Sequence, residues 1–173
     1  MTIKAVIGLG NPGHQYQLTR HSVGFLVADA LADKYGGDWR TRDEMMLAEI
    51  NVDGNKVLVI KPQTFMNNSG RVIPFLAKQG IKPDEIIVVH DELDFPFGKV
   101  ASKKGGSARG HNGVKSLIVA MGEDFYRVRC GIDRPADRSQ VPSYVLQPFK
   151  ESDAEIEQMV VKAVDEVVKL VKT

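Results

Sequence analysis

The sequence predicts a single α/β domain over residues 1–173. Residues 86–90, IIVVH, form a continuous apolar run of the kind found in a central strand that is buried on both faces. Residues 48–52 and 56–61 are β-rich and are joined at Asp53-Gly54, which indicates an antiparallel hairpin. With 173 residues, of which 43% are hydrophobic, the chain suits one domain with a sizeable core.

The first half of the chain is expected to supply a strand, a helix and the hairpin. Residues 4–7 form a short apolar strand. A helix over residues 22–34 follows and ends at Gly36-Gly37. The hairpin comes next, where a repeating βαβ unit would place a crossover to a parallel strand.

The second half is expected to alternate helices and strands. Asn68 or Ser69 caps a helix that runs to residue 79, and Pro74 within it predicts a kink or a late start. After the strand at 86–90, a helix is expected over 113–121 and a strand over 127–132. A capping box at residues 152–155 starts a final amphipathic helix, whose apolar stripe indicates core packing.

Composition excludes several classes of protein. The single cysteine, Cys130, cannot form an internal disulfide and is expected to be a buried thiol in a reducing compartment. We find no signal peptide and no apolar run near the roughly 20 residues that span a bilayer, so a cytoplasmic location is expected. The net charge of +1 excludes a globally basic nucleic-acid binder. Residues 99–115, however, combine glycines with Lys99, Lys103, Lys104, Arg109 and Lys115, so this segment is either a phosphate-binding surface or a solvated loop.

The glycines that follow the first strand permit two interpretations. Gly8, Gly10 and Gly13 satisfy the G-x-G-x-x-G pattern of a dinucleotide-binding fold, which would make the chain an oxidoreductase. In that fold the helix opens within the glycine run, whereas Pro12-Gly13 indicates a turn that delays the helix. The hairpin also breaks the βαβ repeat, so the dinucleotide interpretation is the weaker one.

Polar residues at several loops and one strand end suit hydrolytic chemistry. His21 could deprotonate a water molecule, and Asp91, which follows a buried strand, could orient its ring. Asn11, Asn67 and Asn112 could supply neutral hydrogen-bond donors to a developing oxyanion. We find no G-x-S-x-G nucleophile motif, which favours water as the nucleophile. Each residue also has a structural interpretation, because asparagine and aspartate are common in turns and caps.

A metal site is the less favoured alternative. His21, Asp91, Asp94 and His111 are the candidate ligands, but none shows the paired spacing of a motif such as H-x-x-x-H. His90 is expected to be a core residue and His14 an exposed one.

Several ordered blocks of the chain closely resemble bacterial-type peptidyl-tRNA hydrolase. They begin at Gly8, Lys61, His90, Gly105 and Phe125 and read GLGNPGHQYQLTRHSVGF, KPQTFMNNSG, HDELDFPFGKV, GGSARGHNGVKSLI and FYRVRCGIDRP. The resemblance implies an enzyme that hydrolyses the ester between a peptide and the 3′-terminal ribose of tRNA. It also implies a monomer without cofactor or metal, and a single α/β domain with a twisted, mixed sheet flanked by helices.

The same resemblance implies roles for individual residues. The catalytic base falls on His21 and its acidic partner on Asp91. The substrate-binding residues are Asn11, Tyr16, Met66, Asn67 and Asn112. A clamp on the tRNA 5′-phosphate falls on Lys103 and Arg129, which gives the basic glycine-rich segment a function.

The chain departs from the family pattern at three places. Ser22 stands where asparagine is usual, and Arg109 stands where glycine is common; Thr173 comes before the usual end of the family. The first two departures put one polar contact and one backbone contact to the substrate in question. Besides the esterase, two functions remain open at this point: the dinucleotide-dependent oxidoreductase and a non-catalytic tRNA-binding protein.

Overall fold

The computed structural model describes residues 2–173, which build one seven-stranded mixed sheet. The strand order across the sheet is β2-β3-β4-β1-β5-β7-β6. The strands are β1 (Ala5–Gly8), β2 (Arg40–Arg42), β3 (Met45–Val52), β4 (Asn55–Pro62), β5 (Ile86–Glu92), β6 (Val100–Lys104) and β7 (Tyr126–Gly131). The α-helices are α1 (Val23–Lys34), α2 (Ile73–Lys78), α3 (Asn112–Met121), α4 (Val141–Val145) and α5 (Asp153–Lys172).

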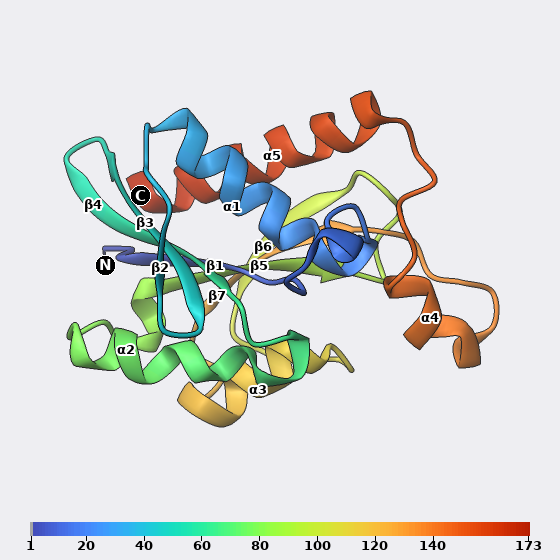
Figure 1. The fold of residues 1–173 in the computed structure, drawn as a ribbon, viewed down its shortest axis with the longest axis horizontal. Coiled ribbons are helices and arrows are strands. Elements are labelled where there is room, and N and C mark those ends of the chain that lie inside the picture. Colours follow the sequence, from blue (N-terminus) through green and yellow to red (C-terminus); the bar gives the residue numbers. More distant parts are fainter. Residues whose placement is uncertain (1) are drawn as a thin grey trace.

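Helices cover both faces of this sheet. Helices α1 and α5 pack on one face, while α2 and α3 lie on the other (Figure 1). Each face has its own cluster of buried apolar side chains. The pairs β1–β4, β1–β5 and β5–β7 are parallel, and β2–β3, β3–β4 and β6–β7 are antiparallel. The predicted fold class, a mixed α/β sheet flanked by helices, is therefore confirmed, while the domain limits at residues 1 and 173 stay a prediction.

The central strand β5 carries the candidate site at its carboxyl end. All seven of its residues are buried, as the apolar run predicts, and β1 and β7 flank it. The strand continues through Asp91 and Glu92, so two acidic side chains belong to the strand and not to a following loop. Their register is fixed by β7, where Cys130 lies opposite Asp91.

The glycines near the N-terminus serve helix packing. A Cβ atom on Gly24 would overlap the main chain of Leu9 and the carbonyl oxygen of Val89, and one on Gly8 would overlap the carbonyl oxygen of Gly24. The first turn of α1 therefore rests directly on the end of β1 and the middle of β5. Because α1 begins at Val23, it does not open within the glycine run, so the structure does not favour the dinucleotide-binding interpretation.

Most other elements agree with the sequence predictions. The hairpin, the strand β7, the helix α3 and the capping box of α5 at Ser152 all form. Pro74 occupies the first turn of α2, so this helix starts late, at Ile73, after a 3₁₀ segment over Met66–Val72. Cys130 and His90 are buried and His14 is exposed, as expected.

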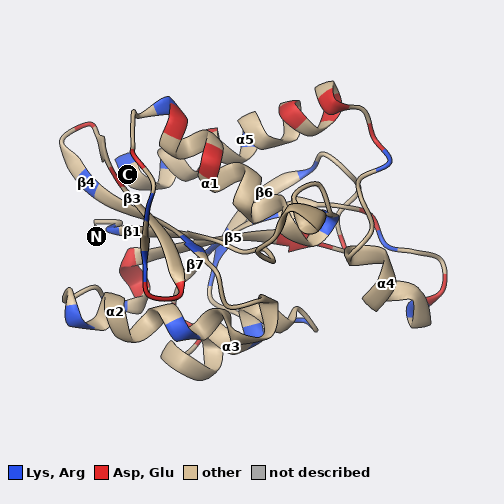
Figure 2. Cartoon of the chain, viewed as in Figure 1, with Lys and Arg blue, Asp and Glu red and all other residues tan. Residues whose placement is uncertain are grey.

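Two edge strands and one short helix were not predicted. The strands β2 and β6 lie at opposite edges of the sheet, and both carry basic residues (Figure 2). Lys103 therefore belongs to an edge strand of the sheet and not to a solvated loop, which was one of the two interpretations of residues 99–115. The helix α4 lies between the predicted strand at 127–132 and the final helix, where no element is predicted. Within residues 2–173, no helix is both long and apolar enough to cross a membrane.

Candidate active site

His21 is held in a short 3₁₀ turn, Arg20–Ser22, directly before α1. The turn is buried, and the residues on either side of His21 contact other segments of the chain. Ser22 Oγ accepts a hydrogen bond from the backbone N–H of Asn11, with 3.1 Å between N and Oγ. The guanidinium of Arg20 stacks on the ring of Tyr144, 3.8 Å from its centroid, and donates to the Tyr144 carbonyl. Ser22 thus links the histidine turn to the Asn11 turn.

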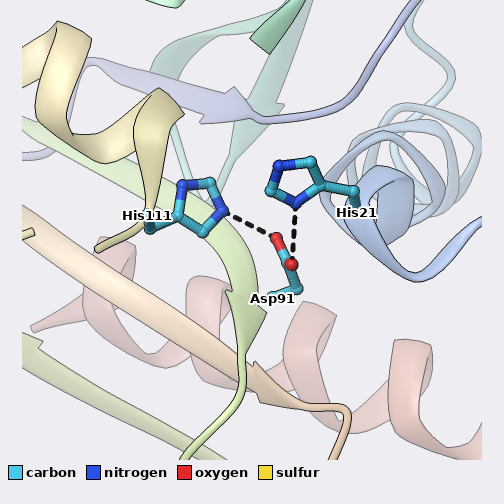
Figure 3. Close-up of side chains that lie close together, drawn as sticks. All are labelled: His21, Asp91 and His111. Carbon is cyan, nitrogen blue, oxygen red and sulfur yellow. Dashed lines mark hydrogen bonds and ion pairs between the residues drawn. The ribbon is translucent and has the colours of Figure 1, made fainter. Parts of the chain in front are cut away.

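The imidazole of His21 donates a hydrogen bond to the carboxylate of Asp91. The distance from His21 Nδ1 to Asp91 Oδ2 is 2.8 Å, and both side chains are buried (Figure 3). Because Asp91 can only accept when ionised, Nδ1 carries the proton. His21 Nε2 then holds a lone pair, as a general base requires.

His111 is a second partner of Asp91 that the sequence reasoning missed. Its Nε2–H donates to Asp91 Oδ1 over 2.7 Å (Figure 3). Its Nδ1 accepts hydrogen bonds from the backbone N–H groups of Gly113 and Val114, at 3.1 and 3.2 Å, and so caps α3. This arrangement requires neutral His111 with its proton on Nε2. The sequence did place His111 just before the predicted helix, and that N-cap position was the available signal.

The two histidines and the carboxylate shift one another's acidity. Burial alone would raise the pKa of Asp91, but the adjacent His21 and His111 imidazoles outweigh burial and hold the pKa well below its usual range. Burial lowers the pKa of His21, and the charge and hydrogen bond of Asp91 more than offset this, so the net shift is upward. His90 differs, because burial lowers its pKa to about 3. His90 is therefore neutral at physiological pH.

His21, Asp91 and His111 are also the group that comes nearest to a metal site in residues 2–173, with ligand atoms within 4.8 Å of one another. The hydrogen bonds do not fit a metal. Ligation through His111 Nε2 would move its proton to Nδ1, which would then face the N–H groups of Gly113 and Val114. Asp94, the fourth candidate ligand, lies outside this group and accepts a hydrogen bond from Arg134.

The amide side chains gather beside His21. A cavity of about 280 Å³ is lined by Asn11, His21, Phe65, Met66, Asn67, Asn112, Pro142, Val145 and Leu146. Asn11 Oδ1 accepts from the backbone N–H of Met66 at 2.8 Å, which leaves its Nδ2–H₂ group to donate into the cavity. Asn67 and Asn112 are exposed, and Met66 is buried. Tyr16 does not line this cavity; its ring packs edge-on against Phe65.

The basic residues line a second cavity, of about 160 Å³, that also borders His21 and Asp91. Lys103 on β6 and Arg129 on β7 come from adjacent antiparallel strands. Arg129 lies 3.8 Å from the Glu92 carboxylate, measured between Nη1 and Oε1. Arg127, which the sequence reasoning did not single out, is almost fully buried and donates to the carbonyls of Ser107 and Glu123. Arg127 thereby fastens the glycine-rich segment to the sheet.

Comparisons with known proteins agree in sequence and in fold. Residues 5–173 match the family model described as peptidyl-tRNA hydrolase. A peptidyl-tRNA hydrolase of Nocardia farcinica is 45% identical over 167 residues, which cover 94% of this chain and 86% of that relative. One from Neisseria meningitidis is also 45% identical, over 94% of this chain and 87% of the relative. The crystal structure of a peptidyl-tRNA hydrolase from Acinetobacter baumannii matches with a TM-score of 0.88 at 35% identity, over 98% of this chain and 87% of that one.

Proposed function

The chain belongs to the peptidyl-tRNA hydrolase family, and from this premise we propose that it hydrolyses the ester between a peptide and the 3′-terminal ribose of tRNA. One observation supports the proposal above the others. His21 presents an unprotonated Nε2 at the junction of two cavities, one lined by amides and the other by cations. A substrate that is part peptide and part nucleic acid needs this division of surfaces.

In the proposed mechanism, His21 acts as a general base on water. Nε2 takes a proton from a water molecule as its oxygen attacks the ester carbonyl. Asp91 stabilises the resulting imidazolium through the hydrogen bond to Nδ1, and it stays ionised because its pKa is low. When the tetrahedral intermediate collapses, the imidazolium gives its proton to the departing ribose oxygen. The free peptide and the free tRNA are the products.

Water is the nucleophile in this scheme because no protein thiol is suitably placed. Cys130 is fully buried within β7, and burial raises the pKa of its thiol to about 12. A thiol that stays protonated and inaccessible cannot attack an ester.

The asparagines would hold the peptide and the reacting carbonyl. Asn11 has one free amide group, because its oxygen is bound to the backbone of Met66. Asn67 and Asn112 reach the same cavity from two separate segments, and their exposed amides have both donors and acceptors to offer. We assign peptide binding to Asn11 and Asn67, with Met66 in the cavity wall. Asn112, at the start of α3, is the candidate oxyanion donor.

The tRNA would be positioned by its 5′-phosphate. Lys103 supplies a point charge and Arg129 a planar fork, a pair suited to one phosphate group. The two side chains line the same cavity from neighbouring strands. We further propose that the protein acts as a cytoplasmic monomer.

The direct test is incubation of the purified protein with peptidyl-tRNA, followed by separation of free tRNA and free peptide. His21→Ala is the matched inactive control. Release of peptide by the wild-type protein and its loss in the variant would support the esterase. Tight binding of tRNA without any release would instead support the non-catalytic tRNA-binding alternative.

A further inference from the structure

Arg109 occupies a backbone conformation that arginine rarely adopts. The N–H of His111 donates to the carbonyl of Ala108 over 3.0 Å, which closes a tight turn. The two central residues, Arg109 and Gly110, have φ values of 49° and 85°. Glycine, asparagine or aspartate normally fills such positions, because other side chains are strained there. The turn itself therefore gives no reason for an arginine.

The side chain of Arg109 borders the basic cavity and is only loosely held. Its side chain is 57% exposed and lines the cavity that also contains His21. The nearest carboxylate is Asp94, with 3.9 Å between Arg109 Nε and Asp94 Oδ2. Asp94 accepts its short hydrogen bond, of 2.7 Å, from Arg134 instead. The donors of Arg109 are thus available to a ligand.

The other two arginines of this cavity are more buried than Arg109. Arg127 donates two of its N–H groups to main-chain carbonyls. Arg129 faces Glu92 and lies over the ring of Phe95, 4.6 Å from the centroid. Arg109 differs from both because its side chain is exposed. It is the arginine of the cavity that can reorganise most readily around an incoming anion.

We infer that Arg109 binds a phosphodiester of the single-stranded 3′ end of the tRNA, next to the nucleotide that carries the scissile ester. The inference rests on the proposed function. The ester is attached to the terminal ribose, so the phosphate nearest to it is the phosphodiester on that same ribose. Arg109 lines the cavity that contains His21 and is its exposed arginine, and its guanidinium fork matches the two free oxygens of this phosphate. The 5′-phosphate, at the other end of the tRNA chain, is left to Lys103 and Arg129.

The test compares substrates that differ in their phosphates. The same peptide is esterified to full-length tRNA with or without its 5′-phosphate, to the trinucleotide CCA, and to adenosine, which has no phosphodiester. Arg109→Asn and Arg109→Gly remove the charge and fit the left-handed conformation, so both should fold. Arg40→Asn, on the exposed edge strand β2 at the opposite side of the sheet, is the matched control.

Both Arg109 variants should lower kcat/KM about tenfold on both full-length substrates and on the CCA ester, the scale of a hydrogen bond to a charged group. The log-log salt slope of kcat/KM should become shallower by about 0.7. The adenosine ester and the Arg40→Asn control should show no change. A loss confined to tRNA with a 5′-phosphate would assign Arg109 to the clamp and overturn the inference. An equal loss on the adenosine ester would overturn it as well, because the turn would then act on catalysis.

Binding of the trinucleotide CCA without an attached peptide, measured by fluorescence titration, tests this inference separately from the proposed function. If wild-type protein hydrolyses none of the esters, the proposed function fails. Weaker CCA binding by Arg109→Asn would still support the phosphodiester contact. Equal binding by wild type and variant would refute it.

Discussion

His111 joins two tasks in one imidazole ring, and its replacement should separate them. His111→Ala removes the hydrogen bond to Asp91 and both bonds that cap α3. A hydrogen bond to a charged group contributes about 1.5–3 kcal/mol, and loss of a helix cap costs about 0.5–2 kcal/mol. We expect His111→Ala to lower the free energy of unfolding by about 3 kcal/mol. His111→Asn should lose less, because asparagine can cap α3 while failing to reach Asp91.

Both variants should alter catalysis in the same direction. With His111 gone, the Asp91 carboxylate keeps one hydrogen-bond partner and draws the proton of His21 more strongly, so the pKa of His21 rises further. The base must be neutral, and activity is therefore lost as the pH falls through this pKa.

The assay is kcat/KM for peptidyl-tRNA between about pH 5 and pH 9, beside chemical denaturation of each variant. We expect the acidic limb to move to higher pH in His111→Ala and His111→Asn alike, although their stabilities differ. A wild-type pH profile in His111→Asn would refute the coupling between His111 and His21. A shift that follows stability alone, large in His111→Ala and absent in His111→Asn, would mean that His111 acts only as a cap.

Other predictions address the base, the clamp and the packing of α1. His21→Ala should lower kcat by about 10²-fold or more with tRNA affinity nearly intact, and Asp91→Asn should be milder. The pKa of His21 is raised on folding, so His21 should stabilise the folded state most fully below about pH 6.5. This contribution to the free energy of unfolding should be lost as the pH rises through the pKa of the folded protein. Thermal denaturation of wild type and His21→Gln at a series of pH values measures this difference. Lys103→Ala and Arg129→Ala should each raise KM for peptidyl-tRNA and hardly matter once the 5′-phosphate is removed. Gly24→Ala should lower the free energy of unfolding by about 1–3 kcal/mol and reduce turnover as well.

Each of these expectations has a result that contradicts it. Near-normal turnover in His21→Ala would remove the base assignment. An unchanged pH dependence of stability in His21→Gln would mean that His21 titrates alike in the folded and unfolded chain. Equal losses with and without the 5′-phosphate would show that Lys103 and Arg129 serve the fold or another tRNA contact. A stable, fully active Gly24→Ala would show that the contact between α1 and the sheet is not tight.

The sequence predicted those helices and strands whose formation is determined by the residues within the element itself. The strand β5 is apolar throughout because both of its faces are covered, and the β3–β4 hairpin has a turn that identifies it. The strands β2 and β6 were not predicted because they are short edge strands with polar, partly exposed side chains. Their sequences lack the apolar–polar alternation of a half-buried strand. Each of these strands forms because it pairs with a neighbouring strand, and the sequence of the segment alone does not specify that pairing.

The same distinction applies to the candidate site. The pairing of His21 with Asp91 could be predicted, because a polar residue at the end of a buried strand faces a ligand crevice in α/β sheets. The bond between Asp91 and His111 could not, since it depends on where α3 begins relative to β5. The partners of Arg127 are main-chain carbonyls, which carry no signal in the sequence. The glycines near the N-terminus fit a phosphate-binding pattern locally, and only the position of α1 shows that they are packing residues.

The contact of Gly24 with the main chain of Leu9 and Val89 has a consequence for how the protein can change. Spacing between a helix and a sheet usually depends on interleaved side chains, which shift when a core residue is exchanged. Here the spacing at the start of α1 is set by atoms that every amino acid shares. We therefore expect the apolar residues farther along α1 to be exchangeable with little change in the distance from His21 to Asp91. Substitutions in the core beneath α1 should then leave the geometry of the reacting groups unchanged. Selection on stability and selection on turnover can therefore act independently over most of this helix.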